Sequence, residues 1–445
     1  MKFHIVTLGC QMNVADADWL TRSLTARGFD PAPEDTADIF ILLTCSVREK
    51  PELKVASLLG RLAEIRQDRP EAFVAVGGCV AQQLGPGLWK RFPMVRLVFG
   101  ADGIFSAPQA IARLAEDPRL RLSLLDFTAT YPEREQAWPN DRVPPRAFVT
   151  IMQGCDNFCA YCIVPFVRGR QKSRGKAAIL AECRELAARG AREITLLGQN
   201  VNSYGQDAAG DGTSFAALLR ALAAIPEIKR LRFTTSHPKD LSDDIIACFA
   251  ELPTLCPALH LPVQSGSDAV LARMGRRYTV AGYHILVDKL RRARPDIALT
   301  TDLIVGFPGE TEADFRQTLA LVREVGFESG FSFMYDARPG TASAHMEPKI
   351  SREEKSARLA ELQTLLDARL AESLAAQVGT RSPVLIEGPS KRGTSDAAWR
   401  GRDPGGRIVN LALPGGEDHT GRIVTARILQ AKKHSLIGEA EADHD

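Results

Sequence analysis

The first hundred residues alternate short apolar runs with amphipathic segments. The apolar runs are FHIVTLG (3–9), IFILLT (39–44) and AFVAVGG (72–78). Segments 15–28 and 50–66, which separate them, have helical patterns, and Gly28 ends the first. Continuous apolar strands separated by helices are typical of buried parallel strands in a layered α/β architecture. The pattern therefore predicts an N-terminal α/β domain over residues 1–120.

A Pro-rich polar segment, 121–145, predicts a linker. Strand–helix alternation then resumes and continues to residue 378. The expected strands are AFVTIMQG (147–154), EITLLG (193–198), RLRFTT (230–235), ALHLPV (258–263), ALTTDLIVG (298–306) and FSFMYD (331–336). Six βα units are too few to close an eight-fold barrel. We therefore expect a partial (β/α)6 barrel over 146–378, with its site in the loops at the carboxyl ends of the strands.

The last part of the chain changes pattern again. A long helix is expected over 351–377. Short β-like runs then follow between Gly-rich turns: PVLIEG (383–388), RIVNLAL (407–413) and GRIVTARILQ (421–430). This pattern predicts a small all-β barrel over 379–441. The predicted fold class is thus α/β, with a parallel N-terminal domain, a partial barrel and a small C-terminal β-barrel.

Composition adds limits to the function. The chain is 45% hydrophobic and 25% charged, which is ordinary for a globular protein. No stretch approaches the roughly 18 apolar residues of a membrane span, and the start MKFHIVTLGCQMN does not resemble a signal peptide. We expect a cytoplasmic protein whose nine cysteines stay reduced and are available for metals or catalysis. Because the net charge is only +2, nucleic-acid contacts must come from local patches.

Three cysteines lie close together in GCDNFCAYC (154–162): Cys155, Cys159 and Cys162. A structural zinc site takes four ligands, and a closed iron–sulfur cube also takes four cysteines. One short loop at the mouth of the barrel could instead hold three irons of a cube and leave the fourth exposed. An exposed iron can bind the amine and carboxylate of S-adenosylmethionine, whose cleavage yields a radical. The alternatives are a zinc site completed by a distant ligand, or chance.

A second set of three cysteines is dispersed along the N-terminal domain. Cys10, Cys45 and Cys79 each follow one of the predicted strands. The carboxyl ends of parallel strands meet at one crevice, so these thiols are expected to converge. The alternative is three buried core cysteines. Cys183, Cys248 and Cys256 lie in expected helices or loops without ligand spacing, and we interpret them as ordinary residues.

Ordered motifs along the whole chain show a resemblance to a known family. They are TLGCQMN at the start, TCSVREK (44–50), VGGCVAQQ (76–83), GCDNFCAYCIVPFVRGR, LLGQNVNSYG, HLPVQSGSD, TDLIVGFPGET and ARPGTASA. The chain resembles the MiaB-type tRNA methylthiotransferases of the radical S-adenosylmethionine superfamily, with a TRAM-like C-terminal barrel. The resemblance implies that Cys155, Cys159 and Cys162 bind the radical-generating 4Fe–4S cluster. It implies that Cys10, Cys45 and Cys79 bind an auxiliary 4Fe–4S cluster whose open iron carries the sulfur to be inserted.

The resemblance also implies a reaction. In this family one S-adenosylmethionine methylates the sulfur, and a second becomes the radical that removes hydrogen from carbon 2 of an adenine. The implied product is 2-methylthio-N6-isopentenyladenosine beside the tRNA anticodon. The implied partners are tRNA carrying isopentenylated adenosine, an electron donor and a sulfur source, neither of the last two identified by the motifs. No catalytic residue beyond the cluster ligands is assigned.

Two kinds of alternative function remain. The first is a sister methylthiotransferase acting on N6-threonylcarbamoyladenosine in tRNA or on an aspartate of a ribosomal protein; the segments SVREK and ARPGT favour the MiaB type over both. The second is a non-enzymatic iron–sulfur protein that binds tRNA. Cleavage of S-adenosylmethionine would separate an enzyme from such a binding protein.

Several further residues are expected to bind S-adenosylmethionine. Tyr161 is placed to pack on the adenine, with an ordinary core aromatic as the alternative. Gly198, Gln199 and Asn200 follow a strand and resemble the segment that meets the methionine part, although loop polarity alone could explain them. Gly306, in GFPGE, permits close approach of the backbone to adenine or ribose, although a simple turn is nearly as good an explanation.

Cationic residues gather just after the cysteine loop and in the C-terminal barrel. In RGRQKSRGK (168–176) the expected phosphate-binding residues are Arg168, Arg170, Lys172 and Arg174. The C-terminal barrel adds Lys391, Arg392, Arg400 and Arg402 on an expected RNA-binding surface, with Arg402 assigned to tRNA. The alternative for the first group is a solvated charged face.

Overall fold

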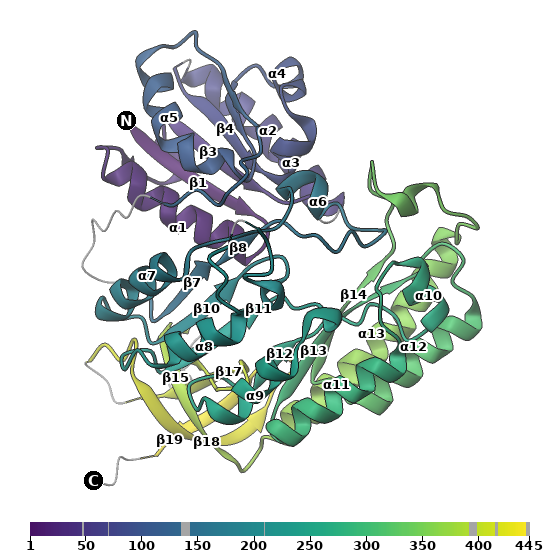
Figure 1. Ribbon diagram of the computed structural model, residues 1–445. Helices are drawn as coiled ribbons and strands as arrows, with labels where there is room; N and C mark the ends of the chain where they lie inside the picture. Colours follow the sequence, from purple (N-terminus) through teal and green to yellow (C-terminus); the bar gives the residue numbers. More distant parts are fainter. Residues whose placement is uncertain are drawn as a thin grey trace.

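The chain folds into three units placed one after another, as Figure 1 shows. The structure is a computed structural model that describes residues 1–46, 49–69, 71–134, 143–208, 210–390, 398–413 and 417–441. Lys391 and Arg392, expected to bind RNA, lie outside these ranges, as does part of the expected linker. Within these ranges, every helix is too short or too polar to cross a bilayer.

The N-terminal unit is a parallel sheet of six strands in the order β2-β1-β3-β4-β5-β6. Its strands are β1 (Lys2–Leu8), β2 (Asp30–Pro31), β3 (Ile39–Thr44), β4 (Phe73–Gly78), β5 (Val95–Phe99) and β6 (Leu122–Leu124). Its helices are α1 (Gln11–Thr25), α2 (Glu49–Asp68), α3 (Cys79–Leu84), α4 (Gly87–Arg91) and α5 (Ala107–Glu116). The first strands follow the flavodoxin-like order, in which ligands bind at the carboxyl ends between β1 and β3.

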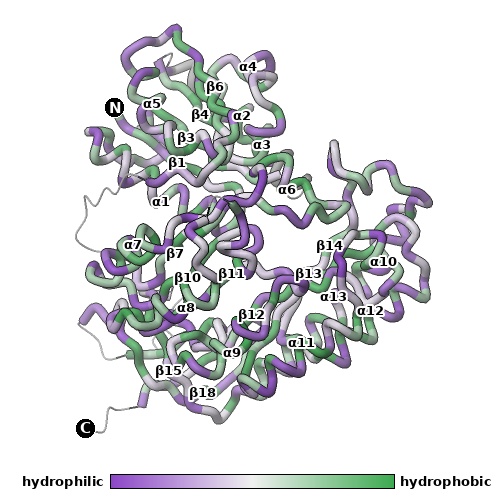
Figure 2. Tube along the Cα trace, viewed as in Figure 1, coloured by the Kyte–Doolittle hydropathy of each residue, from purple (hydrophilic) through white to green (hydrophobic). Residues whose placement is uncertain are grey.

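Side-chain alternation explains why this sheet is covered on both faces. All six residues of β3 are buried. Ile39 and Ile41 belong to one apolar cluster, with α1 and α5, whereas Phe40 and Leu42 belong to another, with α2 and α4. In Figure 2 the tube is mostly green near β3 and β4, the central strands of the sheet. A central strand buried on both faces reads as a continuous apolar run, which is the pattern the sequence shows.

The second unit is the partial barrel, which the expected strands form in sequence order. They are β7 (Arg146–Thr150), β10 (Glu193–Leu197), β11 (Arg230–Thr234), β12 (Ala258–His260), β13 (Ala298–Val305) and β14 (Ser329–Met334). They form two parallel three-stranded sheets, and a bridge between Leu231 and Leu255 connects β11 with the segment before β12. The outer helices are α7 (Lys176–Ala188), α8 (Phe215–Ala223), α9 (Asp243–Glu251), α10 (Asp268–Arg273), α11 (Val280–Ala293) and α12 (Glu312–Val325).

Two segments differ from the sequence prediction. The first expected barrel strand divides into β7 and β8 (Met152–Gln153), and β8 turns away to pair antiparallel with β9 (Lys172–Ser173). The expected linker is partly ordered, because β6 pairs with β5 and Tyr131 packs edge-on against Phe105, with ring centroids 5.4 Å apart. These contacts bury apolar surface, which the polar, Pro-rich composition of the segment does not predict. The domain boundaries themselves stay predictions.

The third unit is a closed barrel in the order β15-β16-β17-β19-β18. Its strands are β15 (Arg381–Pro389), β16 (Trp399–Arg402), β17 (Ile408–Ala412), β18 (Ile423–Ala431) and β19 (Leu436–Ala440). The sequence prediction missed β16 and β19, which are short. Helix α13 (Arg352–Ala375) precedes this barrel, contributing Leu362 and Leu366 to the core of the second unit and Leu374 to the core of the third. The predicted fold class is confirmed.

A buried group of charges lies where the first residues of the barrel strands β7, β10 and β11 contact the small barrel. Glu193 is fully buried and its carboxylate lies 2.8 Å from Arg146 and 3.1 Å from Arg232. Arg146 also pairs with Glu387 of the small barrel at 2.8 Å, and so does Arg402. The guanidinium of Arg402 thus pairs with Glu387 and keeps 23% of its side chain exposed, and its role toward RNA stays a prediction.

We predict that Glu193→Gln destabilises the protein by about 3 kcal/mol, because it leaves buried arginines without their counter-charge. Denaturant unfolding measures the loss. Glu251→Gln is the matched control, because Glu251 pairs with Arg220 on the surface with 47% of its side chain exposed, and it should change stability little. Equal stability of the two variants would contradict the interpretation of the interface.

Candidate active site

The first cysteine set is assembled by the register of three adjacent strands. Leu8 pairs with Thr44, and Thr44 pairs with Gly78, so the three strands end at the same level. Cys45 and Cys79 follow directly, and Cys10 follows two residues after β1. A Cβ at Gly78, which has a φ of +91°, would lie 2.5 Å from the carbonyl oxygen of Thr44. Glycine is therefore required for the strand before Cys79 to approach Cys45 closely.

Cys10 also caps helix α1. Its backbone N–H donates to the Asn13 side chain at 3.3 Å, and the Asn13 amide donates to the carbonyl of Thr44 at 3.2 Å. A hydrogen bond with the Cys45 thiol, aided by the positive charge of Arg168, lowers the pKa of Cys10 to about 5. The N-terminus of a helix favours negative charge. Cys10 is thus prepared to act as a thiolate ligand.

The second cysteine set lies on a loop whose base is the β8–β9 hairpin. Gly154, at the start of the loop, has a φ of +79°, and an added Cβ would lie 2.0 Å from the carbonyl oxygen of Arg170. The Cys155 N–H donates to the Gly169 carbonyl at 3.3 Å, and the Ala160 N–H donates to the Met274 carbonyl at 2.9 Å. The loop is therefore attached at its base and at its tip.

Burial, together with the neighbouring Cys159, raises the pKa of Cys155 to about 11 and that of Cys162 to about 12. Cys155 and Cys162 thus lie close enough to Cys159 for electrostatic interaction. Thiolates are the form that binds iron, so cluster binding here would release protons.

Two side chains that the sequence reading did not select contact Cys159. The Arg276 guanidinium lies 3.5 Å from its sulfur, and Nε2 of His237 lies 3.9 Å from it. Nδ1 of His237 accepts the Lys239 N–H at 3.1 Å, so Nε2 carries the proton that faces the sulfur. Burial and the charge of Arg276 lower the pKa of His237 to about 2, which keeps the ring neutral.

The two cysteine sets adjoin one another. Cys79 packs against Ile163 and Val167. Ile163 directly follows the cysteine loop, and Val167 lies in the next helix, α6 (Val164–Arg168). Gln199 connects the sets, because its carbonyl accepts the Gly154 N–H at 2.7 Å while its amide lies 2.6 Å from the sulfur of Met12. In Figure 1, α6 lies between the N-terminal unit and the barrel. Residues from both units therefore meet in the region of the two sets.

A buried carboxylate fixes the base of the cysteine loop to the N-terminal unit. Asp102 forms an ion pair with Lys172 of β9 and accepts a hydrogen bond from Gln153 of β8. It also accepts the Thr128 N–H at 2.8 Å. One carboxylate thus holds both strands of the hairpin.

The burial of this region corrects the predicted phosphate contacts. Lys172 is 2% exposed and Arg174 is 1% exposed, and Arg174 pairs with Glu182 at 2.7 Å. Arg168 is 4% exposed and faces Cys79 and Cys10. The basic run RGRQKSRGK does not itself show which buried groups its side chains contact in the folded chain. Arg170 alone of the four has an exposed cationic group, paired with Asp156 at 2.7 Å on the surface.

The expected S-adenosylmethionine residues lie around the same mouth. Tyr161 packs beside Phe307 in a small apolar cluster, and its hydroxyl lies 3.5 Å from Arg276. The Asn200 amide donates to Asp240 at 2.7 Å, and Asp240 also accepts from Asn157 of the cysteine loop at 3.1 Å. Gly198 donates its N–H to the Thr234 carbonyl at 3.2 Å. Their roles toward the cofactor stay predictions.

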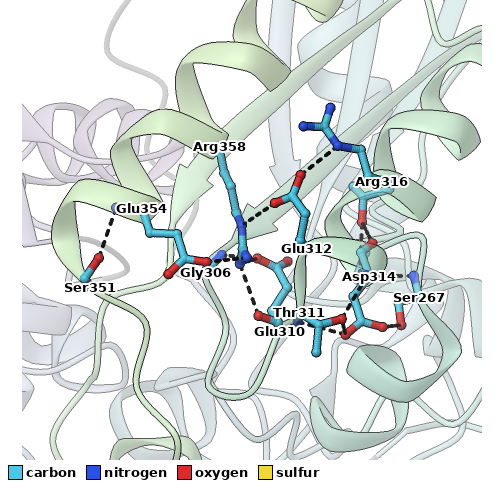
Figure 3. A network of polar contacts seen from close by, with 12 residues as sticks. Ser267, Gly306, Glu310, Thr311, Glu312, Asp314, Arg316, Ser351, Glu354 and Arg358 are labelled. Atoms are coloured by element: carbon cyan, nitrogen blue, oxygen red, sulfur yellow. Dashed lines mark hydrogen bonds and ion pairs between the residues drawn. The ribbon is translucent and has the colours of Figure 1, made fainter.

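The loop that contains Gly306 is held by charges, as Figure 3 shows. The Gly306 N–H donates to Glu310 at 2.6 Å, and Glu310 pairs with Arg358 of α13 at 2.8 Å. Both side chains are buried. The backbone at Gly306, with a φ of +71°, is thus fixed from within the loop and from α13.

The donor sets fit two iron–sulfur cubes better than single metal ions. No group of three His, Cys, Asp or Glu among the described residues is close enough to hold one ion. A cube spreads its irons, each with its own thiolate, so its ligands need not converge on one point. Three thiols on one anchored loop, and three at aligned strand ends, match that requirement.

His237 and Asp240 follow strand β11, so the strand-end rule that selected Gln199 could have found them. Asp102 follows β5 in the same way. Arg276 lies in a loop between two helices, where no sequence signal marks it.

Comparison with known families agrees with these three units. Residues 2–100 match the family described as Uncharacterized protein family UPF0004, residues 149–322 match the Radical SAM superfamily, and residues 375–440 match the TRAM domain.

Similar proteins cover the chain almost completely. A tRNA-2-methylthio-N(6)-dimethylallyladenosine synthase of Nitratidesulfovibrio vulgaris strain DP4 is 57% identical over 438 residues, covering 98% of each chain. Proteins of the same name from Oleidesulfovibrio alaskensis and Geobacter sulfurreducens are 55% and 48% identical, covering 98% and 99% of this chain and 98% and 97% of theirs. The chain belongs to the tRNA-2-methylthio-N(6)-dimethylallyladenosine synthase family. The predicted MiaB-type membership is therefore confirmed.

Solved structures support the fold of this synthase-family chain. The radical S-adenosylmethionine methyltransferase TsrM from Kitasatospora setae, with tryptophan substrate and a SAM analog bound, has a TM-score of 0.57 at 15% identity, covering 88% of this chain and 79% of that one. The cobalamin-dependent radical enzyme OxsB, with aqua-cobalamin and S-adenosylmethionine bound, has a TM-score of 0.50 at 12% identity, covering 82% and 56%. At these identities the likeness shows the shared fold.

We predict that Lys172→Met destabilises the protein by about 3–5 kcal/mol, because it leaves the Asp102 carboxylate buried without its cation. Denaturant unfolding measures the change. The double variant Lys172→Met with Asp102→Asn should recover most of the loss, and Arg170→Met, on the surface, should cost little. Equal losses for the single and double variants would mean that the pair itself is not the cause.

Proposed function

We propose that this protein is a tRNA-2-methylthio-N6-isopentenyladenosine synthase, which inserts sulfur and a methyl group at carbon 2 of an isopentenylated adenosine beside the anticodon. The observation that supports this most directly is the packing of Cys79, from the N-terminal set, against Ile163 and Val167, which directly follow the barrel loop that carries the other three cysteines. Relatives of the same name match the chain from end to end. Their dimethylallyl group is the five-carbon isopentenyl group expected from the motifs.

Two 4Fe–4S clusters and S-adenosylmethionine are the proposed cofactors. Cys155, Cys159 and Cys162 would hold one cluster, and Cys10, Cys45 and Cys79 the other. When bound, the first supplies the electron that generates a deoxyadenosyl radical from S-adenosylmethionine, and the second supplies the sulfur. An aromatic C–H bond resists ordinary acid–base groups, so radical chemistry is what this substrate requires.

The chain's own residues position and shield this chemistry. The β8–β9 hairpin and Asp102 hold the radical loop against the N-terminal sheet. Ile163 and Val167 pack against Cys79 and exclude water from one side of the shared space. The Gly306 loop, fixed through Glu310, would form the wall near the adenosyl group. Preorganised groups of this kind need no rearrangement when the radical forms.

Transfer RNA is the proposed partner, together with an electron donor and a sulfur source. The match to a TRAM domain and the names of the relatives support tRNA. The target base must leave its stack to reach a barrel mouth, as single-stranded loop bases can. The sister activities on threonylcarbamoyladenosine or a ribosomal-protein aspartate are not favoured, because the matched relatives reported above act by name on dimethylallyladenosine.

The division of roles predicts different defects in two cysteine variants. In reduced, reconstituted protein, Cys45→Ala should still form 5′-deoxyadenosine but should not thiolate tRNA, because the radical loop remains intact. Cys159→Ala should lose both. Chromatography of deoxyadenosine and of tRNA nucleosides measures the two products. Identical defects would contradict the division.

The substrate assignment is tested in cells. Deleting the gene should remove 2-methylthio-N6-isopentenyladenosine from tRNA and leave N6-isopentenyladenosine in its place, and the restored wild-type gene should reverse the change. Cys183→Ala is the matched control, because its buried thiol lies in α7 away from both sets. Unchanged tRNA nucleosides in the deletion strain would overturn the assignment.

For tRNA binding, we predict that Arg170→Ala weakens affinity and lowers the slope of log K against log salt by about 1, because one phosphate contact is lost. Filter binding at several salt concentrations measures the slope. Arg316→Ala is the control, because Arg316 is an exposed arginine on the outer helix α12, with 56% of its side chain accessible against 74% for Arg170. An equal effect of both variants would argue against a specific contact.

A further inference from the structure

Each cysteine set has one buried arginine beside it. Arg168 and Arg276 are both 4% exposed, and both come from the barrel unit. Neither was assigned to a cluster by the sequence. A guanidinium keeps its charge at any physiological pH, so each of these residues brings a full positive charge into the interior.

Arg168 reaches from the end of α6 into the N-terminal cysteine set. Its guanidinium donates to the sulfur of Met12 at 3.6 Å, and Val167, the residue before it, packs against Cys79. Burial opposes its charge, but the thiols of Cys79 and Cys10 raise the pKa of Arg168. The carboxylate of Asp16 also acts on it, but that carboxylate is ion-paired with Arg134.

Arg276 has the same relation to the radical loop. Its guanidinium lies 3.5 Å from the sulfur of Cys159 and 3.5 Å from the Tyr161 hydroxyl. Its other contacts are the Tyr278 hydroxyl at 2.9 Å and the Pro262 carbonyl at 2.7 Å. These oxygens are neutral, so the cysteine is the one group among these contacts that can bear a compensating negative charge.

A buried cation that lacks an anion is costly. Three thiolates around a 4Fe–4S core in its 2+ state have a net charge of −1, and a one-electron reduction makes it −2. A cluster at the barrel set would therefore supply a negative charge beside Arg276, and a cluster at the N-terminal set would add its net negative charge to that of the Cys10 thiolate beside Arg168. In return, a fixed positive charge at short range favours the more negative, reduced state of the cluster.

We propose that Arg168 is the counter-charge of the auxiliary cluster and Arg276 that of the radical cluster, and that each raises the reduction potential of its own cluster. The inference rests on the proposed function only in requiring a cluster at each cysteine set. It adds that the auxiliary potential depends on a residue supplied by the barrel, six positions after Cys162. The sites are then coupled through the protein and not only through the substrate.

Each potential is measured in a full-length protein that retains a single cluster. Replacing Cys155, Cys159 and Cys162 by Ala leaves the auxiliary cluster, and replacing Cys10, Cys45 and Cys79 leaves the radical cluster. Anaerobic redox titration followed by electron paramagnetic resonance, without tRNA or S-adenosylmethionine, gives each midpoint potential.

We expect each Gln variant to change the potential of one cluster only. Arg168→Gln should lower the auxiliary potential and leave the radical potential nearly unchanged, and Arg276→Gln should do the reverse. Arg168→Lys and Arg276→Lys, which keep the charge, should stay close to the parent protein. Arg230→Gln, which removes a buried arginine at the closed end of the barrel, should move neither potential.

Other patterns would overturn the inference. No shift in the glutamine variants, equal shifts of both clusters, or Lys variants that behave like Gln variants would each exclude a local charge effect. If a Gln variant loses its iron, retention of four irons by the matching Lys variant supports the inference, and loss from both overturns it. The proposed function fails separately, if wild-type protein with both clusters leaves tRNA unmodified.

Discussion

The arrangement of the active site depends on one buried ion pair. Asp102 comes from the N-terminal sheet, and Lys172 from the hairpin that carries the cysteine loop. Because the same carboxylate also binds Gln153, the two strands of the hairpin cannot move relative to the sheet without exposing a charge to an apolar interior. This ion pair therefore fixes the distance between the two cysteine sets. Gln199 adds a second, uncharged connection between the two units, because its side chain contacts both Met12 of the N-terminal unit and the backbone of the cysteine loop.

The two sets are built on different principles. The N-terminal set uses strand register, so its geometry is as rigid as the sheet, and its first thiol ionises readily at a helix start. The barrel set lies on a loop and relies on glycine conformation, backbone anchors and a neutral histidine. A rigid frame would suit the proposed auxiliary cluster, which must present sulfur at a fixed place. A loop beside the barrel mouth would suit the proposed radical cluster, which exchanges a small-molecule cofactor.

Much of this could be predicted from the sequence, for identifiable reasons. Apolar runs with period and length typical of parallel strands located the sheets, and strand ends located both cysteine sets. Side-chain partners could not be predicted in the same way. Lys172 and Arg174 look like surface cations in a basic run, but each meets a carboxylate at least eight residues away in the sequence. Arg276 contacts a cysteine 117 positions earlier, a relation that exists only in the folded chain. Short strands such as β16 contain too few residues to show a period.

Helix α13 has a thermodynamic consequence for the whole molecule. Its leucines enter two apolar cores, and Arg358 fixes the loop around Gly306 from the same helix. Melting the small barrel would therefore expose the end of a helix whose first turns hold the Gly306 loop. We therefore expect the C-terminal unit to unfold together with the partial barrel and not as an independent domain on a tether.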